Sequence, residues 1–279
     1  MIHGTKPAGE ARPVDLHVHT TRSDGERTPA EIVNGARGSL DAVSICDHDT
    51  VRAYAEIPDE PGIAVLPGIE ISTTLGGNEI HLLGYFPNGL DDSIREGTLQ
   101  FEEARRERVH AGVRALRNDG IALRWEELGR AVGEGVPCRT HVAQVLLEMG
   151  YARSATTLFR QILNRGYFPQ PRLDTAEAVR WVIDRGGVPV WAHPRLDHVE
   201  AELSALVEAG LQGLEVFGPP RRAWERERFF ELVDQHEIGV TGGSDFHRET
   251  RRRRLGRFRF GLDRLPRSLD AWFRDRGIR

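Results

Sequence analysis

The chain has 279 residues, of which 39% are hydrophobic and 29% charged, and its formal net charge at pH 7 is −4. This length can bury a sizeable core and suits either one large α/β barrel or two ordinary domains. No apolar run is long enough to span a bilayer, and the negative charge argues against strong overall attraction to nucleic acid.

The cysteines and the N-terminal segment indicate the cellular compartment of the protein. Cys46 and Cys138 are too few for a disulfide framework. Residues 1–13 are short and polar and lack the apolar stretch of a signal peptide, so they are predicted to be a loose leader. We therefore expect a cytoplasmic protein without a membrane partner and predict no stable protein partner.

The first predicted strand combines an apolar face with a polar one. Its alternation places Asp15, His17 and His19 on the side opposite the apolar residues at positions 14, 16 and 18. Two imidazoles and a carboxylate are costly to bury without partners. A lone His-x-His pair is weak evidence for a metal site, so the interpretation depends on whether similar residues recur at later strand ends.

Strands and short helices alternate over the next part of the chain. A helix begins after Thr28, with Pro29 in its first position and Glu31 completing a capping box, and is predicted to end near Arg37. Strands are predicted over residues 41–46, 62–66, 68–71 and 79–85. This alternation is typical of βα units and a mostly parallel sheet.

Residues 90–166 are predicted to be almost wholly helical. A long charged helix covers residues 91–118, a helix capped by Thr140 covers 142–149, and another covers 154–163. The alternation then resumes, with helices over 174–185, 200–209 and 220–236 and strands over 188–194, 213–217 and 238–247. We predict a barrel of residues 12–90 and 173–265, interrupted by a helical insert of residues 91–172. The insert either caps a site or is a structural appendage.

Ionisable side chains recur at the predicted strand ends, and they include six of the eleven histidines. In a closed α/β barrel such ends converge on one face, where these folds keep their chemistry. Nine acids and imidazoles gathered at one face of a barrel would repel and desolvate one another without cations. The set suits two or three divalent metals sharing a carboxylate, with Mn²⁺ favoured and Fe²⁺ or Zn²⁺ also compatible. Its members are His17, His19, Asp24, His48, Glu70, His81, His193, Asp245 and His247.

Seven motifs, in this order along the chain, resemble those of the PHP (polymerase and histidinol phosphatase) phosphoesterase family. They are His17-x-His19, Ser23-Asp24-Gly25, Cys46-Asp47-His48-Asp49, Gly68-x-Glu70, His81-Leu82-Leu83-Gly84-Tyr85, Ala192-His193-Pro194 and Gly243-Ser244-Asp245-x-His247. The resemblance covers about 165 residues, both barrel segments. It implies a distorted (β/α)7 barrel with a helical insertion and up to three bound metal ions.

The resemblance also implies a distribution of ligands. One metal would be held by His17, His19, Glu70 and Asp245. Glu70 would bridge to a second metal held by His81 and His193, and a third would be held by Asp24, His48 and His247. The neighbouring acids Asp15, Asp47 and Asp49 could orient imidazoles, and Cys46 is expected to be a buried apolar side chain.

Such a centre would hydrolyse a phosphate ester with a metal-activated hydroxide. Asp245 or His247 would carry the proton, and the sequence does not separate this role from metal ligation. The segment 135–143 resembles the insert of one family branch, which contains phosphatases for 3′,5′-bisphosphate nucleotides and 5′-3′ exoribonucleases. Arg139 and His141 match that branch, whereas Cys138 and Thr140 depart from it.

Arg139 and His141 are candidates for binding the substrate phosphate. They lie at a predicted helix start, where backbone N–H groups favour an anion, and arginine adds a two-pronged contact. The alternatives are a surface salt bridge for Arg139 and an ordinary helix-start residue for His141.

Two further segments differ from the branch where substrate would be sensed. Residues 164–171 lack its usual ending, so Tyr167 or Phe168 could stack on a base or merely pack the insert against the barrel. Arg248 follows His247 where the branch has glycine, and the arginine run 251–254 is more typical of a solvated surface than of a nucleic-acid site.

The sequence therefore predicts a metal-dependent phosphoesterase acting on a 3′,5′-bisphosphate nucleotide or a short 5′-phosphorylated RNA. One alternative is a phosphatase for another monoester such as histidinol phosphate, although a small substrate needs no helical cap. Another is a non-catalytic metal module that partners a polymerase. Such a module would be expected to lose metal ligands, and all nine positions are intact.

Overall fold

The computed structural model describes residues 13–218, 221–250, 253–258 and 260–278. The predicted leader before Pro13 and two arginines of the basic run, Arg251 and Arg252, lie outside these residues. Among the described helices, none combines the length and the apolar character needed to cross a membrane.

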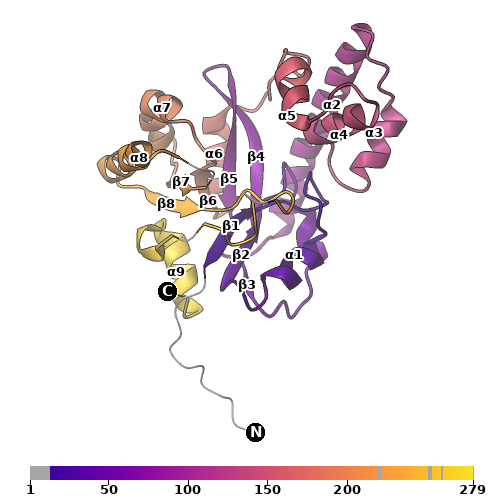
Figure 1. The fold of residues 1–279 in the computed structure, drawn as a ribbon. Helices are drawn as coiled ribbons and strands as arrows, with labels where there is room; N and C mark the ends of the chain where they lie inside the picture. Colours follow the sequence, from indigo (N-terminus) through magenta and orange to yellow (C-terminus); the bar gives the residue numbers. More distant parts are fainter. Residues whose placement is uncertain (1–12, 219–220, 251–252, 259, 279) are drawn as a thin grey trace.

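In the described residues, eight strands form two sheets that lie next to each other (Figure 1). The smaller sheet is parallel and contains β1 (Val14–Val18), β2 (Ala42–Ile45) and β3 (Ala64–Val65). The larger sheet contains, in order, β4 (Gly68–Leu75), β5 (Asn78–Tyr85), β6 (Val188–Trp191), β7 (Gly213–Phe217) and β8 (Gly239–Gly242).

Isolated bridges join the two sheets. Val18 pairs with Phe246 beyond β8, and His48 beyond β2 pairs with Glu70 on β4. The close approach of β1 and the β8 end also requires a glycine, because a Cβ at Gly243 would lie 2.3 Å from the Cβ of His17. The strands therefore form the irregular α/β barrel that the sequence predicts.

The prediction of a mostly parallel sheet needs a correction at β4 and β5. These strands pair antiparallel along their whole length, and β6 is antiparallel to β5, whereas β6, β7 and β8 run parallel. The hairpin turn consists of Gly76 and Gly77, both with positive φ. A two-residue Gly-Gly turn matches the twist of paired strands, so β4 continues to Leu75 rather than ending near residue 71.

Helices cover the outside of the barrel, close to the predicted positions. The capping box of Thr28 and Glu31 is present at the first of them. They are α1 (Pro29–Ala36), α6 (Thr175–Ile183), α7 (Leu196–Glu208) and α8 (Ala223–Gln235).

Helix α9 (Arg267–Asp275) lies beyond the predicted barrel and was not expected from the sequence. Its Leu269, Trp272 and Phe273 pack into the same buried cluster as Val14 and Leu16 of β1. This helix therefore covers apolar side chains of the first strand.

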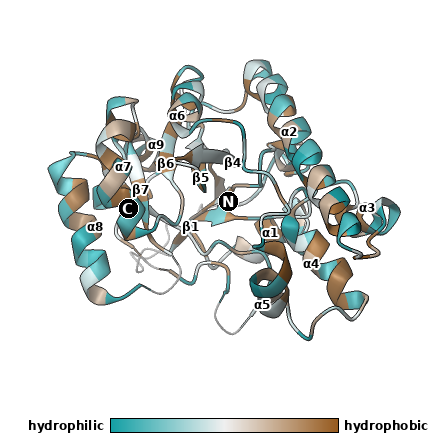
Figure 2. Ribbon diagram, turned by 90° about the horizontal axis from the view of Figure 1, so that it is seen from above, coloured by the Kyte–Doolittle hydropathy of each residue, from teal (hydrophilic) through white to brown (hydrophobic). Residues whose placement is uncertain are grey.

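The insert between β5 and α6 is helical, as predicted, and stands on one side of the barrel (Figure 2). It has its own apolar cluster, built from residues between Val109 and Phe168. Helix α3 was not predicted. The insert consists of α2 (Asp92–Asn118), α3 (Trp125–Val132), α4 (Arg139–Glu148), α5 (Ala155–Leu158) and a π-helical turn, Phe159–Leu163.

Arg105 of α2 fastens the insert to the barrel. Its guanidinium donates to Asp49 Oδ2 at 2.7 Å, to Ser72 Oγ at 2.6 Å and to Cys138 Sγ at 3.4 Å. All four side chains are buried. Such a charge-assisted set is geometrically specific, so α2, α4 and the β4 strand have fixed relative positions.

The aromatic pair at the end of the insert packs rather than opening to a ligand. Phe168 is 8% exposed and lies so close to Gly112 of α2 that a Cβ there would be 2.2 Å from its ring. The Tyr167 hydroxyl donates to Asp119 at 2.6 Å. Of the two roles considered from sequence, packing within the insert is the one these contacts favour.

Candidate metal centre

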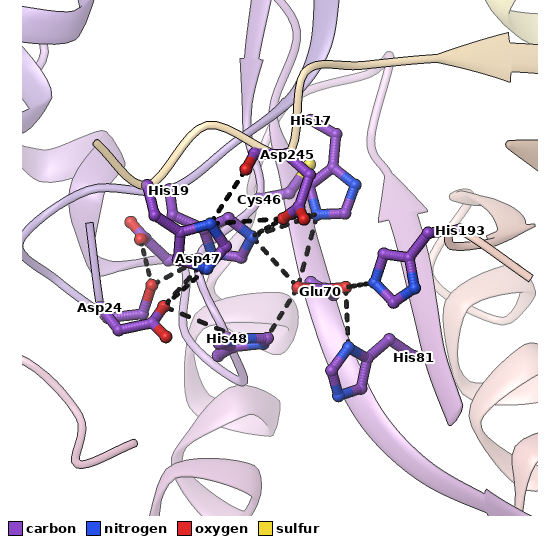
Figure 3. A network of polar contacts seen from close by, with 12 residues as sticks. His17, His19, Asp24, Cys46, Asp47, His48, Glu70, His81, His193 and Asp245 are labelled. Atoms are coloured by element: carbon purple, nitrogen blue, oxygen red, sulfur yellow. Dashed lines mark hydrogen bonds and ion pairs between the residues drawn. The ribbon is translucent and has the colours of Figure 1, made fainter. Parts of the chain in front are cut away.

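The nine residues singled out from the sequence lie close together, and Figure 3 labels eight of them. The ninth, His247, lies against Asp24 and Asp245. Strand β1 and the loop after it supply three of the nine, the loop after β2 one, the β4–β5 hairpin two, and the segments after β6 and β8 the rest. In that order they are His17, His19, Asp24, His48, Glu70, His81, His193, Asp245 and His247.

Glu70 occupies the middle of this group and is 1% exposed. Its Oε1 atom lies 3.0 Å from His81 Nδ1 and 2.9 Å from His193 Nε2. Its Oε2 atom lies 3.0, 3.2 and 3.4 Å from ring nitrogens of His48, His19 and His17, respectively. Each carboxylate oxygen thus faces a different set of imidazoles, which is the arrangement of a bridging ligand.

The antiparallel hairpin explains how two of these residues meet. His81 pairs with Ser72 across the β4–β5 ladder. Glu70 precedes Ser72 by two residues and therefore projects from the same face of the sheet, diagonal to His81.

Two aspartates complete the far side of the group. Asp24 Oδ1 lies 3.2 Å from His247 Nε2 and 3.8 Å from both His19 Nδ1 and His48 Nε2. Asp245 Oδ1 lies 3.4 Å from His19 Nε2. His19 therefore has a carboxylate near each of its two ring nitrogens.

The side chains fit divalent cations. Asp24 Oδ1, Glu70 Oε2, His48 Nδ1 and His81 Nδ1 are buried without a hydrogen bond, although each lies within ion-pair distance of a partner. Buried polar atoms of this kind need a compensating partner. Three groups have ligand atoms within 4.8 Å of one another: His17, His19 and Glu70; His48, Glu70 and His81; and His19, Asp24, His48 and His247.

This grouping differs in detail from the distribution implied by the resemblance. His48 belongs with Glu70 and His81 as well as with Asp24, and His19 belongs to two groups. His193 and Asp245 lie outside the three groups but contact Glu70 and His19, respectively.

Electrostatics make the centre attractive to cations. Burial raises the pKa of Glu70, but His81, His48 and His17 outweigh it and hold the carboxyl well below its usual range. Burial lowers the pKa of His81, yet Glu70 and Glu79 raise it to about 9. The carboxylates therefore remain ionised and draw positive charge onto the imidazoles.

Sequence reasoning missed Glu215 of β7, which is 1% exposed. Its Oε1 atom lies 3.0 Å from His17 Nδ1, and its Oε2 atom accepts the backbone N–H of His193 at 2.7 Å. A carboxylate behind a ligating imidazole fixes the tautomer and the ring orientation. The available signal was a single acid inside the apolar strand 213–217.

The three acids expected to orient imidazoles have different roles. Asp47 reaches an imidazole only through Ser23, whose hydroxyl donates to Asp47 at 2.5 Å and lies 3.3 Å from His19 Nδ1. Asp15 accepts backbone N–H groups of the β8 loop, and Asp49 binds Arg105. The expectation is therefore wrong for Asp15 and Asp49.

Cys46 stays outside the ligand set, as expected. It is fully buried, and its thiol donates to the Leu16 carbonyl at 3.4 Å. Burial raises the pKa of this thiol to about 12, so it remains protonated at neutral pH.

The first turn of α4 meets the metal centre. The Thr140 hydroxyl donates to Asp24 Oδ2 at 2.6 Å, and Arg139 Nη2 lies 3.4 Å from Glu79 Oε2. Glu79, which the sequence did not single out, lies 3.7 Å from His81 Nε2. The prediction of Thr140 as N-cap is wrong: Cys138 is the N-cap, and the threonine side chain points to the barrel instead.

His141 has a defined tautomer. Its Nδ1 accepts the Cys138 backbone N–H at 3.0 Å, which leaves the proton on Nε2. Burial lowers the pKa of this imidazole, so His141 is a neutral donor rather than a cation.

Backbone strain concentrates at the centre. Asp49, His193 and Asp245 are non-glycine residues with φ of 57°, 30° and 49°. This region is disfavoured for residues with a Cβ and persists where surrounding contacts impose it, commonly at functional sites.

Two relatives resemble this chain in sequence over most of its length. A 3′,5′-nucleoside bisphosphate phosphatase from Chromobacterium violaceum is 30% identical over 252 residues, which cover 84% of this chain and 87% of that protein. The 5′-3′ exoribonuclease Rnm from Salmonella typhimurium is 33% identical over 257 residues, 87% of this chain and 88% of that protein. No protein-family model matches the chain.

Two solved structures are similar to this protein in fold. A structure from Bifidobacterium adolescentis, described as a metal-dependent phosphoesterase, superposes with a TM-score of 0.80 at 28% identity and covers 96% of each chain. An amidohydrolase from Chromobacterium violaceum with bound sulfate has a TM-score of 0.79 at 27% identity, covering 92% of this chain and 93% of that one. The chain belongs to the PHP family of metal-dependent phosphoesterases.

Proposed function

We propose that this protein hydrolyses a phosphate ester of a nucleotide, either a 3′,5′-bisphosphate nucleotide or a short 5′-phosphorylated RNA. The observation that carries the proposal is Glu70, whose two oxygens face separate sets of imidazoles. We assign the nine clustered side chains as ligands of two or three divalent cations. Imidazole and carboxylate donors without thiolate favour Mn²⁺, with Fe²⁺ or Zn²⁺ as alternatives.

Cations bound there would supply a hydroxide near neutral pH and offset charge on the phosphoryl oxygens. The protein's own groups would manage the proton. Asp245 is 9% exposed and the His247 side chain 21% exposed, whereas His17 and His19 are fully buried. We assign proton transfer to Asp245 and His247, which reach from the centre to solvent and lie next to one another, with His247 Nδ1 3.4 Å from Asp245 Oδ1. His81 and His193 also reach solvent, but each lies within 3.0 Å of the Glu70 carboxylate.

Arg139 and His141 are assigned to the substrate phosphate. Both belong to the first turn of α4, where the helix dipole favours an anion. Arg139 approaches the centre through Glu79, and its side chain is 33% exposed. The neutral His141 adds an Nε2–H donor.

The choice of a nucleotide rests on the relatives and on the insert. Relatives named for a nucleoside bisphosphate and for RNA are 30–33% identical. A cyclic phosphate substrate is a second candidate, because a phosphoribosyl 1,2-cyclic phosphate 1,2-diphosphodiesterase from Eggerthella lenta is also 30% identical, over 252 residues.

The test is phosphate or nucleotide release by the Mn²⁺-loaded protein from four substrates. These are 3′-phosphoadenosine 5′-phosphate, a 5′-phosphorylated oligoribonucleotide, phosphoribosyl 1,2-cyclic phosphate and histidinol phosphate. We expect kcat/KM for one of the first two to exceed that for histidinol phosphate by at least about tenfold. The Glu70→Gln variant and an oligoribonucleotide without 5′-phosphate are the controls.

Turnover of the cyclic ester alone would replace the nucleotide assignment by the second candidate. Turnover of histidinol phosphate alone would refute both. A metal-loaded protein that hydrolyses none of the four would contradict the enzymatic proposal.

A further inference from the structure

The buried carboxylate of Asp15 binds the backbone at both ends of the loop segment that follows β8. Asp15 Oδ1 accepts the backbone N–H of Ser244 at 2.8 Å, and Asp15 Oδ2 accepts that of Gly256 at 2.7 Å. Asp15 itself is 1% exposed. Because Asp15 is on β1, beside the histidine pair, the loop is fastened against the metal centre.

The acids near this loop are paired with other arginines. Glu249 lies 3.2 Å from Arg27 and 3.6 Å from Arg254. Glu26 lies 3.8 Å from Arg248. These are exposed pairs of the kind that contribute little to stability, as the sequence suggested for a solvated basic run.

Arg253, by contrast, contacts Asp245 and His247 of the metal centre. Its Nη1 donates to the Asp245 carbonyl at 2.9 Å and lies 3.0 Å from Asp245 Oδ2. The same atom lies 3.5 Å from His247 Nδ1. Its backbone is held to Thr250, since the Thr250 N–H donates to the Arg253 carbonyl and the Arg253 N–H donates to Thr250 Oγ1, both at 2.9 Å.

All of these side-chain contacts use one nitrogen of the guanidinium. Nε and Nη2 make no hydrogen bond or ion pair with the described residues, and the Arg253 side chain is 40% exposed. Two donors of a planar fork are therefore available at the rim of the metal centre, in the geometry that binds phosphoryl oxygens.

The charge balance between Asp245 and Arg253 also indicates an anion-binding role for the guanidinium. The two carboxylate oxygens of Asp245 have different partners: Oδ1 lies 3.4 Å from His19 Nε2, and Oδ2 faces Arg253. A cation at the cluster would share the single negative charge of Asp245. Within the described part of the chain, no second carboxylate forms an ion pair with this guanidinium, so an anion is its natural partner.

We propose that Arg253 binds the phosphoryl group of the substrate, anchored through Nη1 to Asp245 and contacting phosphoryl oxygens with Nε and Nη2. This inference rests on the proposed function for the identity of the anion. It assigns one arginine of the basic run to the reaction and leaves Arg248 and Arg254 on the surface.

The test measures binding of inorganic phosphate to Mn²⁺-loaded protein by calorimetry, with metal content determined on the same samples. The variants are Arg253→Ala and Arg253→Lys, and Arg254→Ala is the matched control from the same loop. We expect Arg253→Ala to weaken phosphate binding at least about tenfold, as the loss of charged hydrogen bonds implies. Arg253→Lys should give a smaller loss, and Arg254→Ala should bind as the wild type does, all with equal metal content.

Two results would overturn the inference. One is unchanged phosphate affinity in Arg253→Ala. The other is loss of metal with unchanged phosphate affinity in the loaded fraction, which would make Arg253 a residue that only positions Asp245. Suppose that the wild type hydrolyses no phosphate ester while still binding phosphate, with Arg253→Ala weakening that binding. In that case the proposed function fails and the anion site stands.

Discussion

At the scale of single residues, the proposed metal centre depends on Glu70, a buried carboxylate surrounded by imidazoles. Without cations, its two oxygens face five ring nitrogens at 2.9 to 3.4 Å, and one of these oxygens has no hydrogen bond. Protons can satisfy only part of such a set, because imidazoles that share one carboxylate repel one another when all are charged. Bound divalent cations would resolve this conflict by accepting several donors at once.

Arg139 gives the prediction that belongs to the single-residue scale. Replacing Arg139 with alanine should lower kcat/KM by about tenfold to a hundredfold, the range expected for losing hydrogen bonds to a charged group. Metal content should not change, because Arg139 contacts the centre only through Glu79. The measurement is steady-state kinetics on the preferred substrate, together with metal analysis.

Arg130→Ala, an exposed change on α3, serves as the control and should be neutral. Loss of bound metal in Arg139→Ala would show that the residue is structural and would remove the support for phosphate binding by the insert.

At this scale, sequence reasoning found the residues that stand at strand ends and missed those that act from behind them. His17 and His193 follow a pattern typical of parallel barrel strands, whereas His81 reaches the centre through the antiparallel hairpin. Glu215 contacts His17 across 198 residues of sequence, and only the pairing of the strands reveals this partner. Glu79 lies beside His81 on the same strand, and its distant partners are Arg108 and Arg139 of the insert.

The elements of the insert illustrate how packing decides the role of a side chain. Phe168 could have been a base-stacking residue by sequence, but it fills the space left by the missing Cβ of Gly112. Helix α2 is long and charged, with a narrow buried face. Its position depends on such close contacts and on Arg105, so the insert can present α4 to the metal centre in a fixed orientation.

A pair of glycine substitutions tests this packing. Gly112→Ala should gain about 1 kcal/mol of helix propensity but should be destabilising overall by about 1–3 kcal/mol, because its Cβ would overlap the buried Phe168 ring. Gly129→Ala on α3 has no atom within 4 Å of the new Cβ and should stabilise by about 0.5–1 kcal/mol.

Urea unfolding followed by circular dichroism gives both values. Equal stabilisation by the two substitutions would show that Phe168 does not pack on α2 and would reopen its availability for a ligand.

On the scale of the whole molecule, alternation of strands and helices was enough to predict an α/β barrel, but not its irregularity. The antiparallel hairpin, the separation into two sheets and helix α9 all depend on non-local pairing or on apolar side chains near the C-terminus. The hairpin matters most, since it places Glu70 and His81 on one face of neighbouring strands. A strictly parallel barrel would put them in separate βα units.

Anomalous diffraction from a crystal of the Mn²⁺-loaded protein tests the central claim most directly. The account predicts two or three anomalous peaks among the nine side chains, with the Glu70 carboxylate between two of them. A single peak elsewhere, or none at this cluster in a sample whose solution shows bound manganese, would contradict the assignment of these residues as the metal centre.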